Sequence, residues 1–259
     1  MKFVSFWQNP PGRVTPPYVA LALVSLQRVL KGDFVLLGAA DMERASWVPA
    51  RKDWRFGKLD FLGHPDALSI VARSDFIRMA YVYHHGGYWL DADTIALDDP
   101  RPMLAAANSG SKLHWLNEAL FGARAGNPLL TAAIDRCLAN EEQVWGNPGH
   151  IRELIDAYPD QVLPVSRDLV DPRYCPEYRF TTCDVMLETA LPVHNFLVSP
   201  EVKLLKLYNT YFSRSFIGQM SVADFLCSGT LLARIFLHID PDANRWIAEC
   251  RRLESAISQ

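Results

Sequence analysis

The strongest constraint on the fold comes from one segment, in which a helical pattern ends at a glycine and an apolar stretch carrying two aspartates follows. The apolar periodicity from Asp66 to His85 predicts an amphipathic helix with Asp66 as its N-cap and Gly86 just past its end. Tyr88–Leu97 then predicts a strand interrupted by acids. A helix and an apolar strand joined by so short a connection are typical of an α/β fold.

The start of the chain points to the same class. Lys2–Trp7 is a short β-prone run, Tyr18–Leu30 has helical periodicity, and Phe34–Leu37 is a continuous apolar run typical of a strand buried on both faces. This strand, helix, strand order predicts a Rossmann-like sheet with parallel neighbours. Neither G-x-G-x-x-G nor G-x-x-x-x-G-K-[ST] occurs, which argues against a dinucleotide dehydrogenase and a P-loop enzyme.

The rest of the chain is predicted to be mostly helical. Residues 39–65 look like a long irregular connection because they mix charges, Gly and Pro without periodicity. No linker or repeat interrupts the sequence, so we expect a single domain over residues 1–259. Four helices are predicted in the second half: Leu129–Asn140, His150–Ala157, Val222–His238 and Asn244–Ser255.

Composition excludes several classes of protein. Hydrophobic residues at 49% and charged residues at 21% are typical of a folded globular chain, and a net charge of -3 gives no basic field for nucleic acid. Apolar stretches such as Tyr18–Leu26 are shorter than a membrane span, and the N-terminal residues do not look like a signal peptide. Five cysteines are an odd number without a C-x-x-C pair, which fits neither a disulfide framework nor a Cys zinc site and favours a reducing cytoplasm.

Asp91 and Asp93 are the first candidates for chemistry. A carboxylate in an apolar strand is costly unless a cation or hydrogen bonds compensate it. In an extended segment, residues i and i+2 share a face about 7 Å apart, so both carboxylates could address one hard cation. An all-oxygen site of this kind suits Mn²⁺ or Mg²⁺.

The string S-D-F-I-R-M-A-Y-V-Y-H-H-G-G-Y-W-L-D-A-D, residues 74–93, resembles glycosyltransferases that carry a DXD sugar-binding region. That family includes bacterial capsule and lipopolysaccharide sugar transferases and, more distantly, the clostridial glucosylating toxins. The resemblance implies a GT-A-like α/β fold with a mostly helical C-terminal half. Residues 1–100 would then bind the nucleotide sugar, and residues 101–259 would form the acceptor side.

The same resemblance implies a function. It implies a metal-dependent, retaining transfer of a hexose or N-acetylhexosamine from a nucleotide sugar, with a UDP-sugar favoured, to a saccharide or glycolipid acceptor in cell-surface polysaccharide synthesis. Peripheral association with a membrane would be compatible with such acceptors. By this resemblance, the catalytic residues are Asp91, Asp93 and Arg78, and Asp91 and Asp93 also hold the metal. The residues that would bind the substrate are Trp7, Asp75, Arg78, Trp89 and Asn117.

Three of these residues can also be argued from the chain itself. Asp75 and Arg78 are three apart on the predicted helix, so they share a face and can pair with each other or hold a polar ligand between them. Trp7 ends the first strand at the carboxyl edge, where open α/β sheets bind ligands. A tryptophan there could stack on a nucleotide base or belong to the core.

A third metal ligand is predicted from the C-terminal half. Some bacterial relatives carry an H-L-W-N-like element, and K-L-Y-N at 206–209 is similar to it, with Lys206 in place of the His. Asn209 is therefore the preferred candidate ligand. His194 is the alternative, although a lone His is more often a structural hydrogen-bonding residue.

Two other functions compete with this interpretation. The segment D-A-D-T-I at 91–95 also resembles the nucleophile strand of haloacid-dehalogenase-like phosphatases, although that strand normally opens such a chain. The chain could also be a sugar-nucleotide-binding relative without turnover. The intact S-D-x-x-R and D-x-D patterns argue against this loss.

Overall fold

The computed structural model describes residues 1–47, 65–105, 110–139, 144, 146–174 and 181–257. Contacts divide the chain into two compact units, each built from three segments. Unit 1 comprises Met1–Val14, Asp33–Asp91 and Met103–Val165, and unit 2 comprises Thr15–Gly32, Ala92–Pro102 and Ser166–Gln259. Each unit is described by itself.

Unit 1 is built on a six-stranded mixed sheet in the order β2-β1-β3-β6-β5-β7. β1 is parallel to both β2 and β3, β6 is antiparallel to β3 and β5, and β7 is parallel to β5. The strands are β1 (Phe3–Phe6), β2 (Phe34–Leu37), β3 (Gly87–Leu90), β5 (Leu113–Asn117), β6 (Leu120–Ala123) and β7 (Val162–Pro164).

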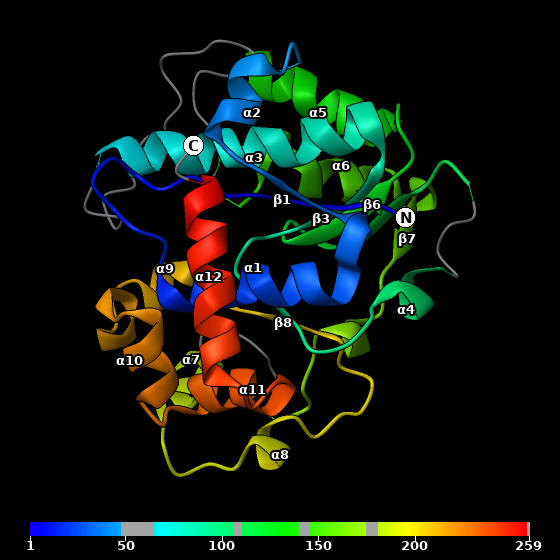
Figure 1. The fold of residues 1–259 in the computed structure, drawn as a ribbon. Coiled ribbons are helices and arrows are strands. Elements are labelled where there is room, and N and C mark those ends of the chain that lie inside the picture. The colour runs from blue at the N-terminus through cyan, green and yellow to red at the C-terminus, as the bar shows by residue number, and fades with distance from the viewer. Residues whose placement is uncertain (48–64, 106–109, 140–143, 145, 175–180, 258–259) are drawn as a thin grey trace. The chain divides into compact units, whose positions relative to one another are not determined.

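Helices of unit 1 cover one face of this sheet (Figure 1). The long helix α3 contacts β1, β3, β6 and α5, and the core cluster between them includes Val4, Phe76, Trp89 and Phe121. This burial fixes the position of α3 relative to the carboxyl end of β3. The helices are α2 (Ala39–Arg44), α3 (Pro65–His85), α5 (Pro128–Ala139) and α6 (Ile151–Ala157).

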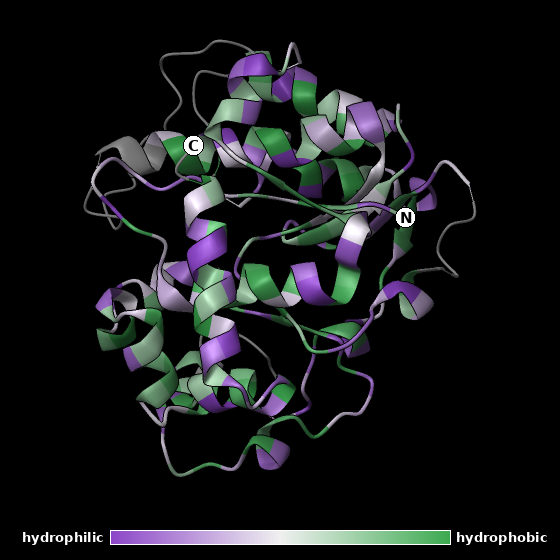
Figure 2. Cartoon of the chain, in the orientation of Figure 1, coloured by the Kyte–Doolittle hydropathy of each residue, from purple (hydrophilic) through white to green (hydrophobic). Residues whose placement is uncertain are grey.

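Unit 2 contains a two-stranded antiparallel sheet, β4 (Thr94–Ala96) with β8 (Leu204–Lys206), and the buried helix α1 (Pro17–Leu30). α1 contacts β4, α10 and α12. Figure 2 shows hydrophilic and hydrophobic residues alternating along α12, which buries only one face. The remaining helices of unit 2 are α7 (Thr181–Leu187), α8 (Val193–Phe196), α9 (Asn209–Phe212), α10 (Val222–Cys227), α11 (Leu231–Ile239) and α12 (Ala243–Ile257). Helix α4 (Arg101–Ala105) contains a boundary between the two units, after Pro102.

The α/β class and most predicted elements are confirmed. β2 has the predicted bounds, while β1, α1, α5, α6 and α12 differ from prediction by one or two residues at their ends. The predicted helix ending at His85 is α3, but it begins at Pro65, so Asp66 lies within its first turn and is not the cap. Gly86 follows the helix with φ +69°, the left-handed conformation expected there.

The predicted strand Tyr88–Leu97 is interrupted at the acids, as expected, but its two parts belong to different sheets. The chain forms β3 up to Leu90, turns through Ala92 and Asp93, and continues as β4 in a different sheet. The turn gives the carboxylate of Asp93 hydrogen-bonding partners that a buried ladder could not provide. The two aspartates therefore do not lie on one strand face.

Two other predictions are corrected. Val222–His238 is two helices, α10 and α11, because Gly229 adopts φ +71° and the Thr230 hydroxyl accepts from Ala233 N, which starts a new helix. The connection 39–65 begins with helix α2, and its residues 48–64 lie outside the described residues. Within the described part of the chain, no helix combines the length and apolar character needed to cross a membrane.

Candidate active site

In unit 1, helix α3 presents Asp75 and Arg78 on one buried face. Asp75 is fully buried and Arg78 is 8% exposed. The Arg78 guanidinium donates through Nη2 to Asp75 Oδ1. Through Nη1 it donates to the Glu118 carbonyl, at 2.8 Å. The expected i, i+3 pair therefore forms, in the interior and not on the helix surface.

Asp91 lies at the carboxyl end of β3, next to this pair. Its Oδ1 is 3.9 Å from Arg78 Nη1 and accepts a 2.8 Å hydrogen bond from the indole N–H of Trp89. Its backbone N–H donates to the Ala119 carbonyl at 3.0 Å. Trp89 is 1% exposed and belongs to the core, so it positions Asp91 from the interior.

Two polar atoms of the pair have no hydrogen-bond partner among the described residues. They are Asp75 Oδ2 and Arg78 Nε, and both are buried. An unsatisfied buried polar group costs about 1–3 kcal/mol, and more when it is charged. The pair thus offers one acceptor and one donor that a hydroxyl-bearing ligand could satisfy.

In unit 2, Asp93 is held by the last residue of β8 and by the segment that follows it. Its Oδ2 accepts from Asn209 N at 2.8 Å, and its Oδ1 accepts from Lys206 Nζ. The Asn209 amide oxygen in turn accepts from the Tyr18 hydroxyl at 2.6 Å. Burial first, and then the charge of Asp93, raise the pKa of the Tyr18 phenol, which therefore stays a neutral donor.

The fit to a divalent cation differs between the two aspartates. Carboxylate and amide oxygens are suitable ligands for Mn²⁺ or Mg²⁺. At Asp93, however, both oxygens have chain partners, and one partner is a cation. The described residues contain no group of three or more His, Cys, Asp or Glu side chains that could hold a metal ion. Asp93 fits a metal only after Lys206 moves away.

The other predicted site residues have varied surroundings. Trp7 follows β1, is half-buried outside the core cluster, and donates its indole N–H to Asn9 at 2.9 Å. Asn117 ends β5, where its side-chain oxygen accepts from Ala119 N and Leu120 N, as in an Asx turn of the β5–β6 hairpin. His194 is exposed in α8.

Sequence reasoning missed three residues near the carboxyl ends of the strands. Glu118 is 9% exposed in the β5–β6 turn and binds the Arg152 guanidinium. The Arg73 guanidinium binds Gln8, beside Trp7. The position of Arg73 directly before S-D-x-x-R was a usable signal, whereas nothing local marks Glu118 or Arg152.

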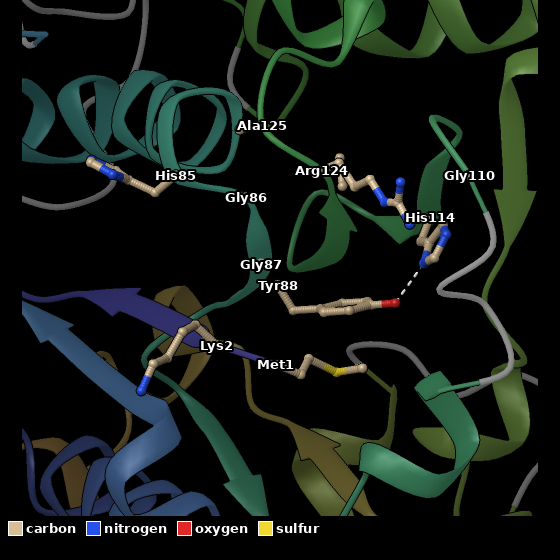
Figure 3. A pocket seen from close by; sticks show the side chains of 11 residues that line it. Met1, Lys2, His85, Gly86, Gly87, Tyr88, Gly110, His114, Arg124 and Ala125 are labelled. Carbon is tan, nitrogen blue, oxygen red and sulfur yellow. Dashed lines mark hydrogen bonds between the residues drawn. The ribbon is translucent and has the colours of Figure 1, made fainter.

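A separate cavity of about 310 Å³ lies at the amino ends of β1 and β3. Figure 3 shows the Tyr88 hydroxyl pointing to His114 Nδ1 at this cavity. Since Asp91 and Trp7 follow the carboxyl ends of these strands, the cavity is at the other edge of the sheet. None of the predicted site residues lines it.

Comparison with solved structures gives distant likenesses. The chain is similar to "PaToxG Glycosyltransferase", with a TM-score of 0.41 and 9% identity over 61% of this chain and 68% of that one. It is also similar to the apo-form glycosyltransferase GlyE of Streptococcus pneumoniae TIGR4, with a TM-score of 0.47 and 13% identity over 97% of this chain. The likeness spans 63% of GlyE, less than two thirds of that chain. No curated protein matches.

Residues 43–110 match the family model described as glycosyltransferase sugar-binding region containing DXD motif. The matched segment includes Asp75, Arg78, Asp91 and Asp93, the residues on which the resemblance was based. The predicted resemblance is confirmed, and the mixed α/β sheet that carries the motif agrees with the GT-A-like fold class. The match identifies residues 43–110 as a segment similar to the DXD-containing sugar-binding region of glycosyltransferases.

Proposed function

We propose that this glycosyltransferase moves a hexose or N-acetylhexosamine from a nucleotide sugar, with a UDP-sugar favoured, to a saccharide or glycolipid acceptor. Retention of the anomeric configuration and a role in cell-surface polysaccharide synthesis are part of the proposal and follow from the family resemblance. A cytoplasmic location is also proposed, because five cysteines, an odd number, do not fit the disulfide framework typical of oxidising compartments.

The observation that carries this proposal is the buried Asp75–Arg78 pair beside Asp91. Asp75 Oδ2 and Arg78 Nε lack partners among the described residues, and Arg78 is within 3.9 Å of Asp91. A sugar hydroxyl can donate to a carboxylate and accept from a guanidinium, so it complements both atoms. The pair would hold the donor sugar next to the first aspartate of the motif.

Mn²⁺ or Mg²⁺ is the proposed cofactor, with Asp91 and Asp93 as ligands and Asn209 as a further candidate. When bound, such an ion would stabilise negative charge on the leaving diphosphate. Trp89 and Arg78 orient the Asp91 carboxylate from the side of the core. Lys206 supplies positive charge at Asp93.

In this proposal the protein positions the reactants and does not supply a nucleophile. Asp75 and Arg78 would orient the sugar, Trp7 would stack on the nucleotide base, and the leaving phosphate would help deprotonate the acceptor. The matched family model describes a sugar-binding region, which argues against the alternative function as a phosphatase.

The proposal is tested by comparing binding of UDP-sugars with binding of UDP in the wild type and in Asp75→Asn. Loss of a charged hydrogen-bond acceptor should weaken binding of the UDP-sugar about tenfold or more and change UDP binding little. Asp41→Asn, at an exposed carboxylate that pairs with Arg44, is the matched control. Calorimetry measures both affinities.

Equal losses for UDP-sugar and UDP would show that Asp75 does not hold the sugar. The proposed stacking of Trp7 on uracil is tested by measuring UDP binding in two variants. Trp7→Ala should lose affinity for UDP, whereas Trp7→Phe keeps an aromatic ring and should retain most of that affinity. A GDP-sugar that binds more tightly than every UDP-sugar would contradict the proposed donor.

A further inference from the structure

The carboxylate of Asp93 already holds a cation that belongs to the chain. The β4–β8 register pairs Thr94 with Lys206, so Lys206 lies beside the residue that follows Asp93, and its ammonium binds Asp93 Oδ1. The two side chains are only 18% and 9% exposed. Water therefore screens this ion pair much less than it would screen a surface pair.

The rest of Asp93 is fixed by the same short segment. Its Oδ2 accepts from Asn209 N at 2.8 Å, and its main-chain carbonyl accepts from Leu207 N at 2.7 Å. The strand pairing of Leu205 with Ile95 precedes Lys206 and these two contacts follow it, so the backbone on both sides of Lys206 is held close to Asp93. Both carboxylate oxygens have partners in the chain.

A divalent cation on Asp93 would meet the ammonium of Lys206 at contact distance. Like charges repel strongly where water is largely excluded, so the ion and Lys206 cannot share this carboxylate without a large cost. We propose that Lys206 and a divalent metal ion compete for Asp93, so that Lys206 sets how tightly the DXD motif binds metal. This inference rests on the proposed function, in which Asp93 is a metal ligand.

The test is a titration of the protein with Mn²⁺ alone, followed by electron paramagnetic resonance of the free ion, without nucleotide. Lys206→Met and Lys206→Gln both remove the charge, and each should bind Mn²⁺ at least about tenfold more tightly than the wild type. Lys206→Arg keeps the charge and should bind Mn²⁺ as weakly as the wild type.

Lys203→Met is the matched control. Lys203 directly precedes β8, and its ammonium also binds an aspartate, Asp98, at 2.7 Å. Asp98 lies outside the DXD motif, so removing this ion pair should leave Mn²⁺ affinity unchanged. Adding Asp93→Asn to Lys206→Met should abolish the gain, because the gain depends on the freed carboxylate.

A second measurement uses the wild type and so does not depend on whether the variants fold. Diamagnetic Mg²⁺ should shift the side-chain ammonium resonance of Lys206 over the same concentration range that shifts the backbone amide resonance of Asn209, because both groups bind Asp93. An Asn209 shift without a Lys206 shift would overturn the proposal.

Unchanged or weaker Mn²⁺ binding in both neutral Lys206 variants would also overturn it. Sugar transfer is measured separately, so failure of the proposed function can be distinguished from failure of the competition between Lys206 and the metal ion. Absence of transfer with every nucleotide sugar would remove the proposed function, while a tenfold gain in Mn²⁺ affinity would still establish competition at Asp93.

Discussion

At the residue scale, the proposed function gives the Asp75–Arg78 pair two roles. The pair is buried, so it influences stability, and two of its polar atoms lack partners among the described residues, which is why we propose that it also binds the sugar. Variants of this pair must therefore be compared for unfolding as well as for binding. The same holds for Asp93, which holds the segment after β8 in place.

Arg78→Met should destabilise the protein by about 3–5 kcal/mol, because it leaves the fully buried Asp75 carboxylate without a counter-charge. Adding Asp75→Asn should recover part of this loss. Urea unfolding measures both values. The control is Arg44→Met, whose ion pair with Asp41 is exposed and should cost well under about 1 kcal/mol. Similar losses for Arg44→Met and Arg78→Met would contradict the assigned role.

The buried imidazole of His114 should make the stability of the fold depend on pH. Burial lowers the pKa of its imidazole below the usual 6.5. The unfolded chain therefore takes up a proton at a higher pH than the folded chain does. The contribution of His114 to stability is fully present above the unfolded-state pKa, is lost as the pH falls below 6.5, and stops changing once the pH is below the folded-state pKa.

Urea midpoints between about pH 8 and about pH 5 test this prediction. His114→Gln should lose less stability over this range than the wild type, since Gln has no proton to gain. His194→Gln, at an exposed histidine, is the control and should follow the wild type. The prediction fails if His114→Gln and the wild type lose stability equally.

At the element scale, the glycine pair between α3 and β3 fixes how the helix and the strand meet. Gly87 has φ +105°, and a Cβ there would lie 2.7 Å from the Lys2 carbonyl. The strand can therefore approach the N-terminal residues closely only because residue 87 has no side chain. This approach lets β3 begin beside the start of β1, where Tyr88 N donates to the Lys2 carbonyl at 2.9 Å.

Gly87→Ala should destabilise the fold by about 2 kcal/mol or more, through backbone strain together with the clash at Lys2. Gly126→Ala is the control, because Gly126 also has positive φ, +77°, but has nothing within 4 Å of the added Cβ. It should cost about 1 kcal/mol. Thermal unfolding of the two variants separates the clash from the strain, and equal losses would show that the close approach is unimportant.

At the scale of the whole molecule, the two units are interleaved along the sequence. Helix α1 lies near the start of the chain, yet it contacts β4, α10 and α12, and two of these three elements come from residues beyond 166. Strands β5 to β7 lie beyond residue 100 in the sequence, yet they belong to the same sheet as β1. The proposal that residues 1–259 form a single domain can be tested through this interleaving.

A fragment of residues 1–165 should fail to unfold cooperatively, because α1 would lose α10 and α12 and expose its apolar side chains. Circular dichroism during heating and binding of a hydrophobic dye would detect this. The full chain is the control and should melt in a cooperative transition without binding the dye. A fragment that melts as sharply as the full chain would show that unit 1 folds alone.

Local pattern was enough to predict the α/β class, β1, β2, the longer helices and the Asp75–Arg78 pair, but not the strands β5 to β8. Hydrophobic periodicity and the three-residue spacing on a helix are properties of a short stretch of chain, so one sequence contains them. The same reasoning missed the end of β3 at Leu90, since whether a strand continues depends on the partner it finds. β4 finds its partner in β8, more than 100 residues later.

The surroundings of the two aspartates were decided only by the tertiary structure. Lys206 is 113 residues from Asp93, and the Glu118 carbonyl is 40 residues from Arg78. The register of β4 with β8 and the turn between β5 and β6 bring these groups together, and neither is encoded by spacing near the motif. The sequence therefore indicated these carboxylates as candidates, while long-range strand pairing determined that Asp93 is bound to Lys206 and that Arg78 binds the Glu118 carbonyl.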